Sequence, residues 1–186
     1  MSQVIADDAN GNAVVVLLDS QKRAKDRELA EVARDLVDTP YAGGGKDIKG
    51  VDCSGLVNLA FRIMGYRKVP YMQASELGNG KVSWLNPIEN PSKDAETKPG
   101  MLNFFRLGSS GIVHVNIGAG LAPGEEKAQI VDATSSSDMQ QRTDLRAGQY
   151  MIPKKANVNM TYGPWPVSEG PAAQATVDWD AFQFLR

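Results

Sequence analysis

The first regular pattern of apolar and polar positions along the chain is helical. Residues 29–37 carry apolar side chains at the i, i+3, i+4, i+7 spacing among charged ones, namely Leu29, Val32, Ala33, Leu36 and Val37. This spacing is typical of the buried face of an amphipathic helix. Asp19 or Ser20 is a suitable N-cap. We expect the helix to end at Thr39, because a residue before proline disfavours the α region.

A second helical pattern begins at Cys53, after a glycine-rich loop at residues 41–45. Its apolar face consists of Leu56, Val57, Ala60, Phe61 and Met64. Gly65 is a natural C-terminal stop, since glycine readily takes the left-handed conformation that follows many helices. The pattern therefore predicts that Cys53 lies in the first turn of a buried helix.

After residue 100 the apolar spacing changes from helical to alternating. Residues 101–107, 111–119 and 128–133 are typical of three short strands separated by turns that contain Gly or Pro. Helices that precede strands, without βαβ alternation, favour the α+β class. We therefore expect N-terminal helices packed on an antiparallel sheet.

The remaining segments give weaker patterns. Residues 14–18 fit either an edge strand or the start of the first helix. The proline-bearing residues 66–100 are expected to be mainly connection, with one short helix near residues 72–77. Three further expectations concern the C-terminal part: a strand at residues 149–152, an ordered loop around Trp165 at residues 157–171, and a closing strand at residues 181–185.

Length and charge limit the range of functions. A chain of 186 residues fits a single core, so we expect an extension at residues 1–20 and one catalytic domain at residues 21–186. The 20 basic and 22 acidic residues give a net charge of −2, which argues against nucleic acid as a partner. The longest apolar run, residues 13–18, is too short to span a membrane or to act as a secretory signal.

The chain contains one Cys and one His. These counts exclude an intramolecular disulfide and the usual zinc sites, so we predict no metal and no cofactor. A cysteine nucleophile needs the thiolate form, which a helix N-terminus and a nearby imidazole stabilise. Cys53 and His114 are 61 residues apart, so they pair only through the tertiary fold. The alternatives are an inert buried cysteine and a hydrogen-bonded histidine in a strand.

Several short segments resemble the NlpC/P60 family of cysteine peptidases, which act on bacterial peptidoglycan. The nucleophile region is carried by Pro40-Tyr41-Ala42-Gly43-Gly44, Asp52-Cys53-Ser54-Gly55-Leu56-Val57, Phe61 and Gly65. The later landmarks are Val69-Pro70, Pro99-Gly100, Phe104-Phe105, Ile112-Val113-His114-Val115 and Ile130-Val131-Asp132-Ala133. The resemblance covers about residues 25–150 and implies a papain-like α+β core.

The resemblance also implies roles for individual residues. Cys53 is similar to the family's nucleophile, and His114 to the base that activates it. The backbone N–H of Cys53 is a natural oxyanion donor, with Tyr41 as a candidate to complete the hole or to orient the substrate. Asp52 and Ser54 are candidates to hold an amine or amide of the stem peptide, and helix capping is the equally weighted alternative for both.

Two positions depart from the family pattern. The third polar residue, which orients the imidazole, is most often His in the family, whereas Asp132 stands at the matching position here. A carboxylate performs this task well because it stabilises an imidazolium directly. Asn116 is a rival, since it shares a strand face with His114. Met101 replaces the usual Asp after Pro-Gly, which affects a turn contact and not the chemistry.

The resemblance implies a hydrolase that cleaves an amide bond in the peptidoglycan stem peptide. We expect cytoplasmic synthesis without a secretory signal, and action in the periplasm of a target cell after specialised export, as for type VI secretion effectors. A cognate immunity protein is then an expected partner. The alternatives are a phage lysin or tail hydrolase, a cytosolic murein-recycling peptidase, a Cys-His acyltransferase or amidase acting on small molecules, and a non-enzymatic binding module.

Overall fold

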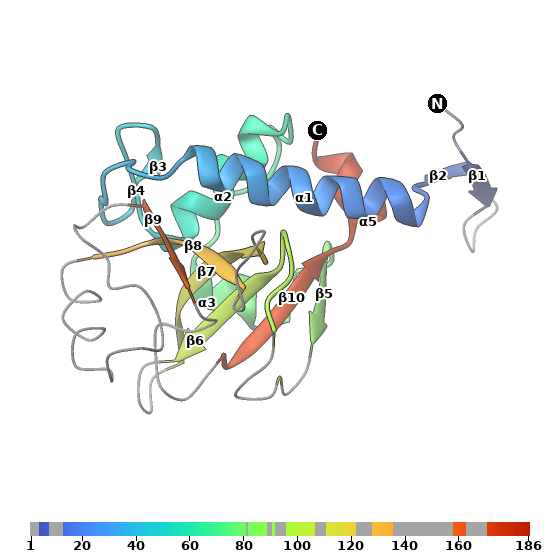
Figure 1. Cartoon of the computed structure of the whole chain (residues 1–186). Coiled ribbons are helices and arrows are strands. Elements are labelled where there is room, and N and C mark those ends of the chain that lie inside the picture. The colour runs from blue at the N-terminus through green and yellow to red at the C-terminus, as the bar shows by residue number, and fades with distance from the viewer. Residues whose placement is uncertain are drawn as a thin grey trace.

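The chain folds into helices that lie across one side of an antiparallel sheet (Figure 1). The structure, a computed structural model, describes residues 4–7, 13–80, 82–88, 91, 96–106, 111–121, 128–135, 158–162 and 171–186. The helices are α1 (Asp19–Asp35), α2 (Cys53–Ile63), α3 (Ala74–Gly78), α5 (Trp179–Phe182) and a 3-10 helix at Gln183–Leu185.

The central sheet has six strands in the order β5-β10-β6-β7-β8-β9, and every neighbouring pair is antiparallel. Its strands are β5 (Leu85–Ile88), β6 (Leu102–Arg106), β7 (Ile112–Gly120), β8 (Gln129–Ala133), β9 (Val158–Tyr162) and β10 (Ala173–Val177). Two small hairpins complete the fold, β1 (Val4–Asp7) with β2 (Ala13–Val16), and β3 (Lys46–Asp47) with β4 (Gly50–Val51). The predicted α+β class is confirmed.

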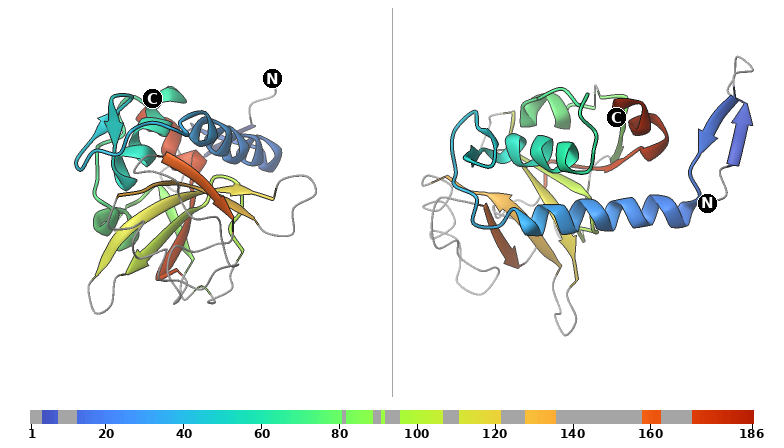
Figure 2. Two further views of the ribbon diagram at one scale, coloured as in Figure 1. Left: turned by 60° about the vertical axis from the view of Figure 1, so that its left-hand side comes forward. Right: turned by 90° about the horizontal axis from the view of Figure 1, so that it is seen from above.

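The layers are clearest in the two turned views of Figure 2, where the sheet twists beneath the helices and the β1–β2 hairpin lies at the outer end of α1. Alternate residues of a strand point to opposite faces. One face of β6, β7 and β8 joins the helices in a single apolar core through Leu102, Phe104, Val115, Ile117 and Val131. The opposite face carries the polar positions between them, Asn103, Asn116 and Asp132.

An aromatic cluster closes the core against the C-terminus. Phe61 of α2 lies 4.5 Å from Phe182 and 5.8 Å from Trp84 between ring centroids. Tyr66 and Trp179 pack against the same group. Offset and edge-on aromatic contacts of this kind add to the apolar area that the rings bury. The C-terminal segment is thereby fixed to the helix that begins at Cys53.

The predicted strand at residues 181–185 is wrong, because this segment forms α5 and the 3-10 helix. Asp178 caps α5, and its carboxylate accepts from the backbone N–H groups of Asp180 and Ala181. An acidic cap of this kind starts a helix even where the following apolar residues alternate. The sheet strand lies just before it, at β10.

Three other expectations need correction. Part of the segment 157–171 is strand β9 and not a loop, while Trp165 and residues 149–152 lie outside the described residues. Residues 66–100 contain strand β5, which tolerates Pro87 because it lies at the edge of the sheet. Helix α1 begins at Asp19 after the cap residue Leu18 and ends at Asp35, earlier than expected.

Candidate active site

Cys53 is the first residue of α2, held there by a tight loop. The N-cap residue Asp52 accepts a hydrogen bond from the backbone N–H of Gly55 at 2.6 Å. The loop approaches this first turn so closely that a Cβ on Gly55 would lie 1.8 Å from the Gly45 carbonyl oxygen. A Cβ on Gly45 would in turn lie 2.4 Å from the carbonyl oxygen of Gly50. Glycine is therefore required at both positions to hold the loop against the nucleophile.

The Asp52 carboxylate accepts from four donors. Oδ1 receives the Gly55 N–H and the Ser54 hydroxyl at 3.1 Å. Oδ2 receives the Gly44 N–H at 2.9 Å and the Tyr71 hydroxyl at 3.1 Å. Helix capping, one of the two interpretations of Asp52, is thus what the structure shows. Substrate contact by Asp52 and by the buried Ser54 stays a prediction.

Tyr71 belongs to this group, although it is not among the site residues predicted from the sequence. Its hydroxyl lies 3.3 Å from the Ser54 hydroxyl, and the ammonium of Lys46 lies 5.3 Å from its ring centroid. Burial raises the pKa of Tyr71, and the negative charges of Asp52 and Cys53 raise it further, against a lowering by the Ser54 bond. Its position directly after the family landmark Val69-Pro70 was the available signal.

His114 of β7 is paired with Asp132 of the neighbouring strand β8. The imidazole Nε2 lies 2.7 Å from Asp132 Oδ1, with 12% of the His114 side chain and none of the Asp132 side chain exposed. The rival residue Asn116 instead accepts from Asn103 through its Oδ1. The structure therefore gives Asp132, and not Asn116, as the partner of the imidazole.

The electrostatic surroundings favour a charged imidazole. Burial alone would lower the pKa of His114, but the charge and hydrogen bond of Asp132 and the contact with Cys53 hold it well above its usual value. Since Nε2 faces Asp132, Nδ1 is the ring nitrogen that remains for the sulfur of Cys53. A cationic imidazole beside a helix N-terminus stabilises a cysteine thiolate. The arrangement can therefore supply a nucleophile and a proton donor side by side.

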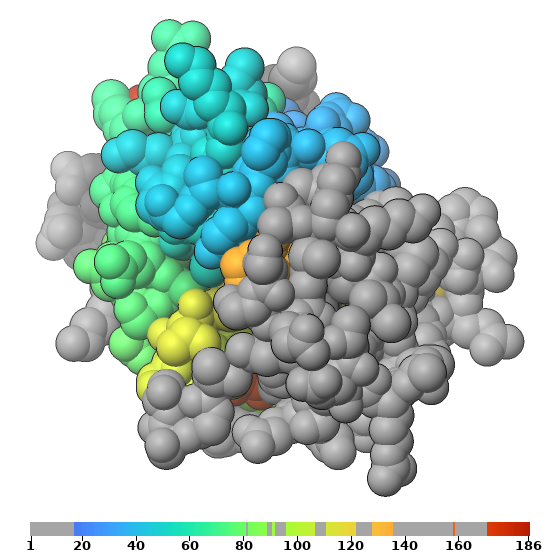
Figure 3. Space-filling model, turned by 90° about the vertical axis from the view of Figure 1, so that its left-hand side faces the viewer, coloured from blue at the N-terminus to red at the C-terminus, as the bar shows by residue number. Residues whose placement is uncertain are grey.

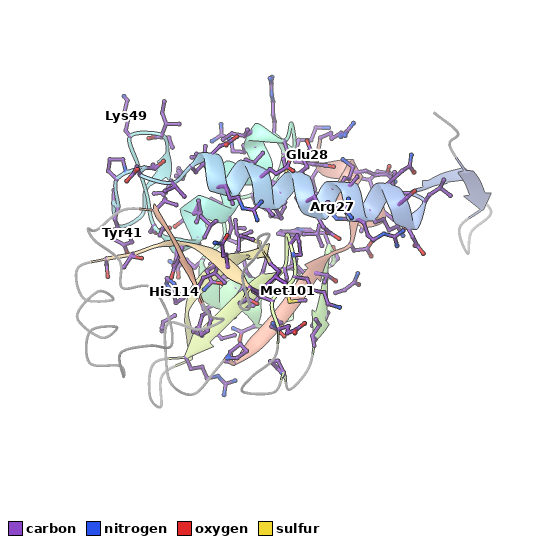
Figure 4. All side chains as sticks on the ribbon, in the orientation of Figure 1. Arg27, Glu28, Tyr41, Lys49, Met101 and His114 are labelled. Atoms are coloured by element: carbon purple, nitrogen blue, oxygen red, sulfur yellow. The ribbon has the colours of Figure 1, made fainter. Side chains whose placement is uncertain are left out.

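The segments that carry these residues adjoin on one face of the molecule. Figure 3 shows this face, where the blue loop before α2, the green surface that follows α2 in the chain and the yellow start of β7 lie side by side, with part of β8 in orange at the edge of the loop. In Figure 4, Tyr41 lies on the loop and His114 on the sheet at this same end, while Met101 lies farther along the sheet. Tyr41 is half-buried and forms a bridge with Val51, two residues before Cys53.

Neither a metal-binding cluster nor a membrane-spanning helix occurs among the residues that the structure describes. No group of three or more His, Cys, Asp or Glu side chains in this part of the chain is placed to hold a metal ion. Among the described helices, none has the length and apolar character needed to cross a membrane.

Comparisons with known proteins give a family and a structural neighbour. The sequence model of the NlpC/P60 family matches residues 38–158, a range that includes Cys53, His114 and Asp132. A similar solved structure is the crystal structure of the NlpC/p60 domain of peptidoglycan hydrolase SagA, with a TM-score of 0.51 and 20% identity, covering 82% of this chain and 98% of that chain. Curated proteins give no match. The structural likeness confirms the papain-like fold.

Proposed function

Because this chain belongs to the NlpC/P60 family of cysteine peptidases and amidases, we propose that it hydrolyses an amide bond in the stem peptide of bacterial peptidoglycan. The observation that carries the proposal is the 2.7 Å pairing of His114 with Asp132, combined with the contact between His114 and Cys53 at the start of α2. The similar solved domain comes from a protein described as a peptidoglycan hydrolase, which supports the substrate class.

In the proposed reaction, the Cys53 thiolate attacks the carbonyl carbon of the scissile amide and forms a C–S bond. The resulting oxyanion accepts from the backbone N–H of Cys53, which has no partner within α2 because helix N-termini leave such groups unpaired. The C–N bond then breaks, and the His114 imidazolium donates its proton to the departing amine. This first half of the reaction releases the amine and leaves the acyl group bound to Cys53 as a thioester.

Water completes the cycle. Neutral His114 removes a proton from a water molecule, whose oxygen attacks the thioester carbon. Collapse of the second oxyanion breaks the C–S bond, releases the new carboxyl group and restores the thiolate–imidazolium pair. Asp132 keeps the imidazole oriented and stabilises its charge throughout. In this proposal Tyr41 completes the oxyanion hole or orients the substrate, and Asp52 and Ser54 face the stem peptide.

We extend the proposal to a biological role as an antibacterial effector. A stem-peptide hydrolase weakens the wall wherever it meets unprotected peptidoglycan, so we expect it to act in the periplasm of a target cell after specialised export. The producer would then need an immunity protein that blocks the Cys53 site. Directed expression in the periplasm of a susceptible bacterium should arrest growth with the wild type and not with Cys53→Ala. Normal growth with the wild type would contradict the effector role.

The hydrolase proposal is tested on purified sacculi. Wild type should release fragments with new amino and carboxyl termini, each cleaved amide gaining the mass of one water. Cys53→Ala, a change that removes only the sulfur, should lower the rate by about 1,000-fold or more while the protein stays folded. Unchanged muropeptides in the wild-type reaction would overturn the proposal. The termini identified by mass spectrometry would also name the bond that is cut.

A further inference from the structure

A line of polar side chains crosses the central sheet and leads to Asp132. Gln174 of β10 lies opposite Asn103 of β6, and Asn103 lies opposite Asn116 of β7. The β7–β8 register pairs Ile117 with Val131, so one further step sets Asp132 beside Asn116. Four neighbouring strands therefore contribute one polar residue each to a single row, called here the amide row: Gln174, Asn103, Asn116 and Asp132.

The amide row is buried. Asn103, Asn116 and Asp132 have no exposed surface, and Gln174 has 3%. Polar groups buried in this way destabilise a fold unless they are hydrogen-bonded. Apolar residues of the same size would fit these strand positions at lower cost. Packing alone therefore does not explain why these four buried strand positions carry polar residues.

The hydrogen bonds of the amide row run in one direction. Gln174 donates through Nε2 to the backbone carbonyl of Glu96 at 3.3 Å and to Asn103 Oδ1 at 3.0 Å. A backbone carbonyl only accepts, so it fixes which end of the Gln174 amide is the donor. Asn103 Oδ1 is then the acceptor, and Asn103 Nδ2 donates to Asn116 Oδ1 at 2.8 Å. The orientation of every amide follows from the first.

This direction turns the donor end of Asn116 away from β6. Its Oδ1 is taken by Asn103, and its Nδ2 is a buried nitrogen without a hydrogen-bond partner. The next side chain in the row is the carboxylate of Asp132. A row of amides aligned head to tail presents its positive end to that anion, and such dipoles strengthen one another in a low-dielectric interior.

We propose that Asn116 is a positioning residue which, oriented by Asn103 and Gln174, keeps the Asp132 carboxylate ionised and directed at His114. The inference rests on the proposed function only in taking Asp132 as the group that orients the catalytic imidazole. Among the residues that the structure describes, His114 of β7 faces this carboxylate, and Cys53 of α2 contacts the imidazole. Asn159 of β9 lies opposite Asp132 in the sheet.

The first measurement needs no substrate. His114 is the only histidine of the chain, so its imidazole gives a unique NMR signal whose titration reports its pKa. In the Cys53→Ala background, Asn116→Ala should lower the pKa of His114 toward its ordinary value, because the Asp132 carboxylate loses the amide dipole that favours its ionised form and then stabilises the imidazolium less. Gln174→Leu, at the far end of the amide row, is the matched control and should shift the pKa of His114 less than Asn116→Ala does. An unchanged or raised pKa in folded Asn116→Ala would overturn the proposal.

The second measurement separates positioning from packing. With the Cys53 thiol present, Asn116→Ala should lower kcat/KM by about 10-fold, the scale of a lost interaction with a charged group. If Asn116 acts through Asp132, adding Asn116→Ala to Asp132→Asn should cause no further loss. Equal losses in both backgrounds would overturn the proposal and identify a structural role. If sacculi are not cleaved at all, the proposed function fails, but the NMR titration still decides the role of Asn116. The two proposals can therefore be rejected independently.

Discussion

The two faces of strands β6, β7 and β8 are both closed to solvent along most of their length, but by different chemistry. On the face toward the helices, Val115, Ile117 and Val131 belong to the apolar core that anchors α1 and α2. On the opposite face, Asn103, Asn116 and Asp132 are equally buried and are joined by directed hydrogen bonds or the pair with His114. Neighbouring residues of one strand thus belong to two different environments.

The two environments predict different effects of a substitution on stability and on activity. Apolar burial is non-directional and contributes stability roughly in proportion to area. A buried polar group gains little net stability from its hydrogen bonds, yet it fixes one arrangement of charge. We therefore expect changes on the helix face to lower the free energy of unfolding, and changes on the polar face to lower activity.

The largest expected effect is that of Asp132→Asn on the polar face. The substitution keeps the size of the side chain and removes the charge that stabilises the His114 imidazolium. The rate of sacculus cleavage should fall by about 100- to 10,000-fold, the scale of losing a carboxylate that orients a catalytic histidine. The circular dichroism spectrum should stay that of the wild type. Activity close to wild type would show that another group orients His114.

The counterpart on the helix face is Ile117→Ala, in the neighbouring strand β7. Ile117 has no exposed surface, so its truncation should lower the free energy of unfolding by about 2–5 kcal/mol, measured by urea denaturation. The specific activity of the folded protein should stay near that of the wild type.

Two further variants serve as controls for Ile117→Ala. Ile117→Val should cost only about 0.5–1.5 kcal/mol and covers the case in which the alanine variant does not fold. Val113→Ala, at a half-exposed position of β7, should change stability by less than about 0.5 kcal/mol. A loss of activity in folded Ile117→Val as large as that of Asp132→Asn would contradict the separation of the two faces.

The helix face could be predicted from the sequence, and the reason is periodicity. The 3.6-residue pattern located α2 and its start at Cys53, and the two-residue pattern located β6, β7 and β8. Three strands of the central sheet, β5, β9 and β10, were not predicted. In β5 and β10 the composition hides the pattern, because Pro87 interrupts β5 and small or polar residues make up most of β10. Their strand conformation comes from pairing with the rest of the sheet.

The polar face could be predicted only in part. A single Cys and a single His left one possible pair, and the structure places the two in contact. The partner of His114 could not be decided between Asp132 and Asn116, because the choice depends on the β7–β8 register across a long turn. The amide row depends on the register of three strand pairs in the same way. Tyr71 reaches Asp52 through a tertiary contact over 19 residues.

The His114–Asp132 pair on the polar face should make the stability of the protein depend on pH. The folded protein holds the pKa of His114 well above the usual value of about 6.5 that the unfolded chain has. The pair with Asp132 therefore stabilises the fold fully below pH 6.5 or so, and this contribution is lost as pH rises through the higher folded pKa. In Cys53→Ala, urea denaturation should show stability falling over that window. The added change His114→Gln should remove this fall, and its persistence would assign the effect to another group.

The smallest expected effect concerns the other carboxylate beside Cys53. Tyr71→Phe removes the hydroxyl that donates to Asp52 Oδ2 and keeps the ring beneath Lys46. Asp52 retains three donors, so the free energy of unfolding should fall by only about 1 kcal/mol and KM should change by about 3- to 10-fold. Sacculus cleavage at varied substrate concentration measures the second value, with kcat expected to stay close to wild type.

Tyr66→Phe is the matched control for Tyr71→Phe. The Tyr66 hydroxyl has no hydrogen-bond partner, and Tyr66 has no exposed surface, whereas Tyr71 is half-buried. Losing an unpaired buried polar atom costs nothing in bonding, so Tyr66→Phe should be neutral or stabilising. If both substitutions have the same effect, the Tyr71 hydroxyl contributes nothing through Asp52. If only Tyr71→Phe changes KM, Asp52 transmits the position of that hydroxyl to the start of α2, where Cys53 lies.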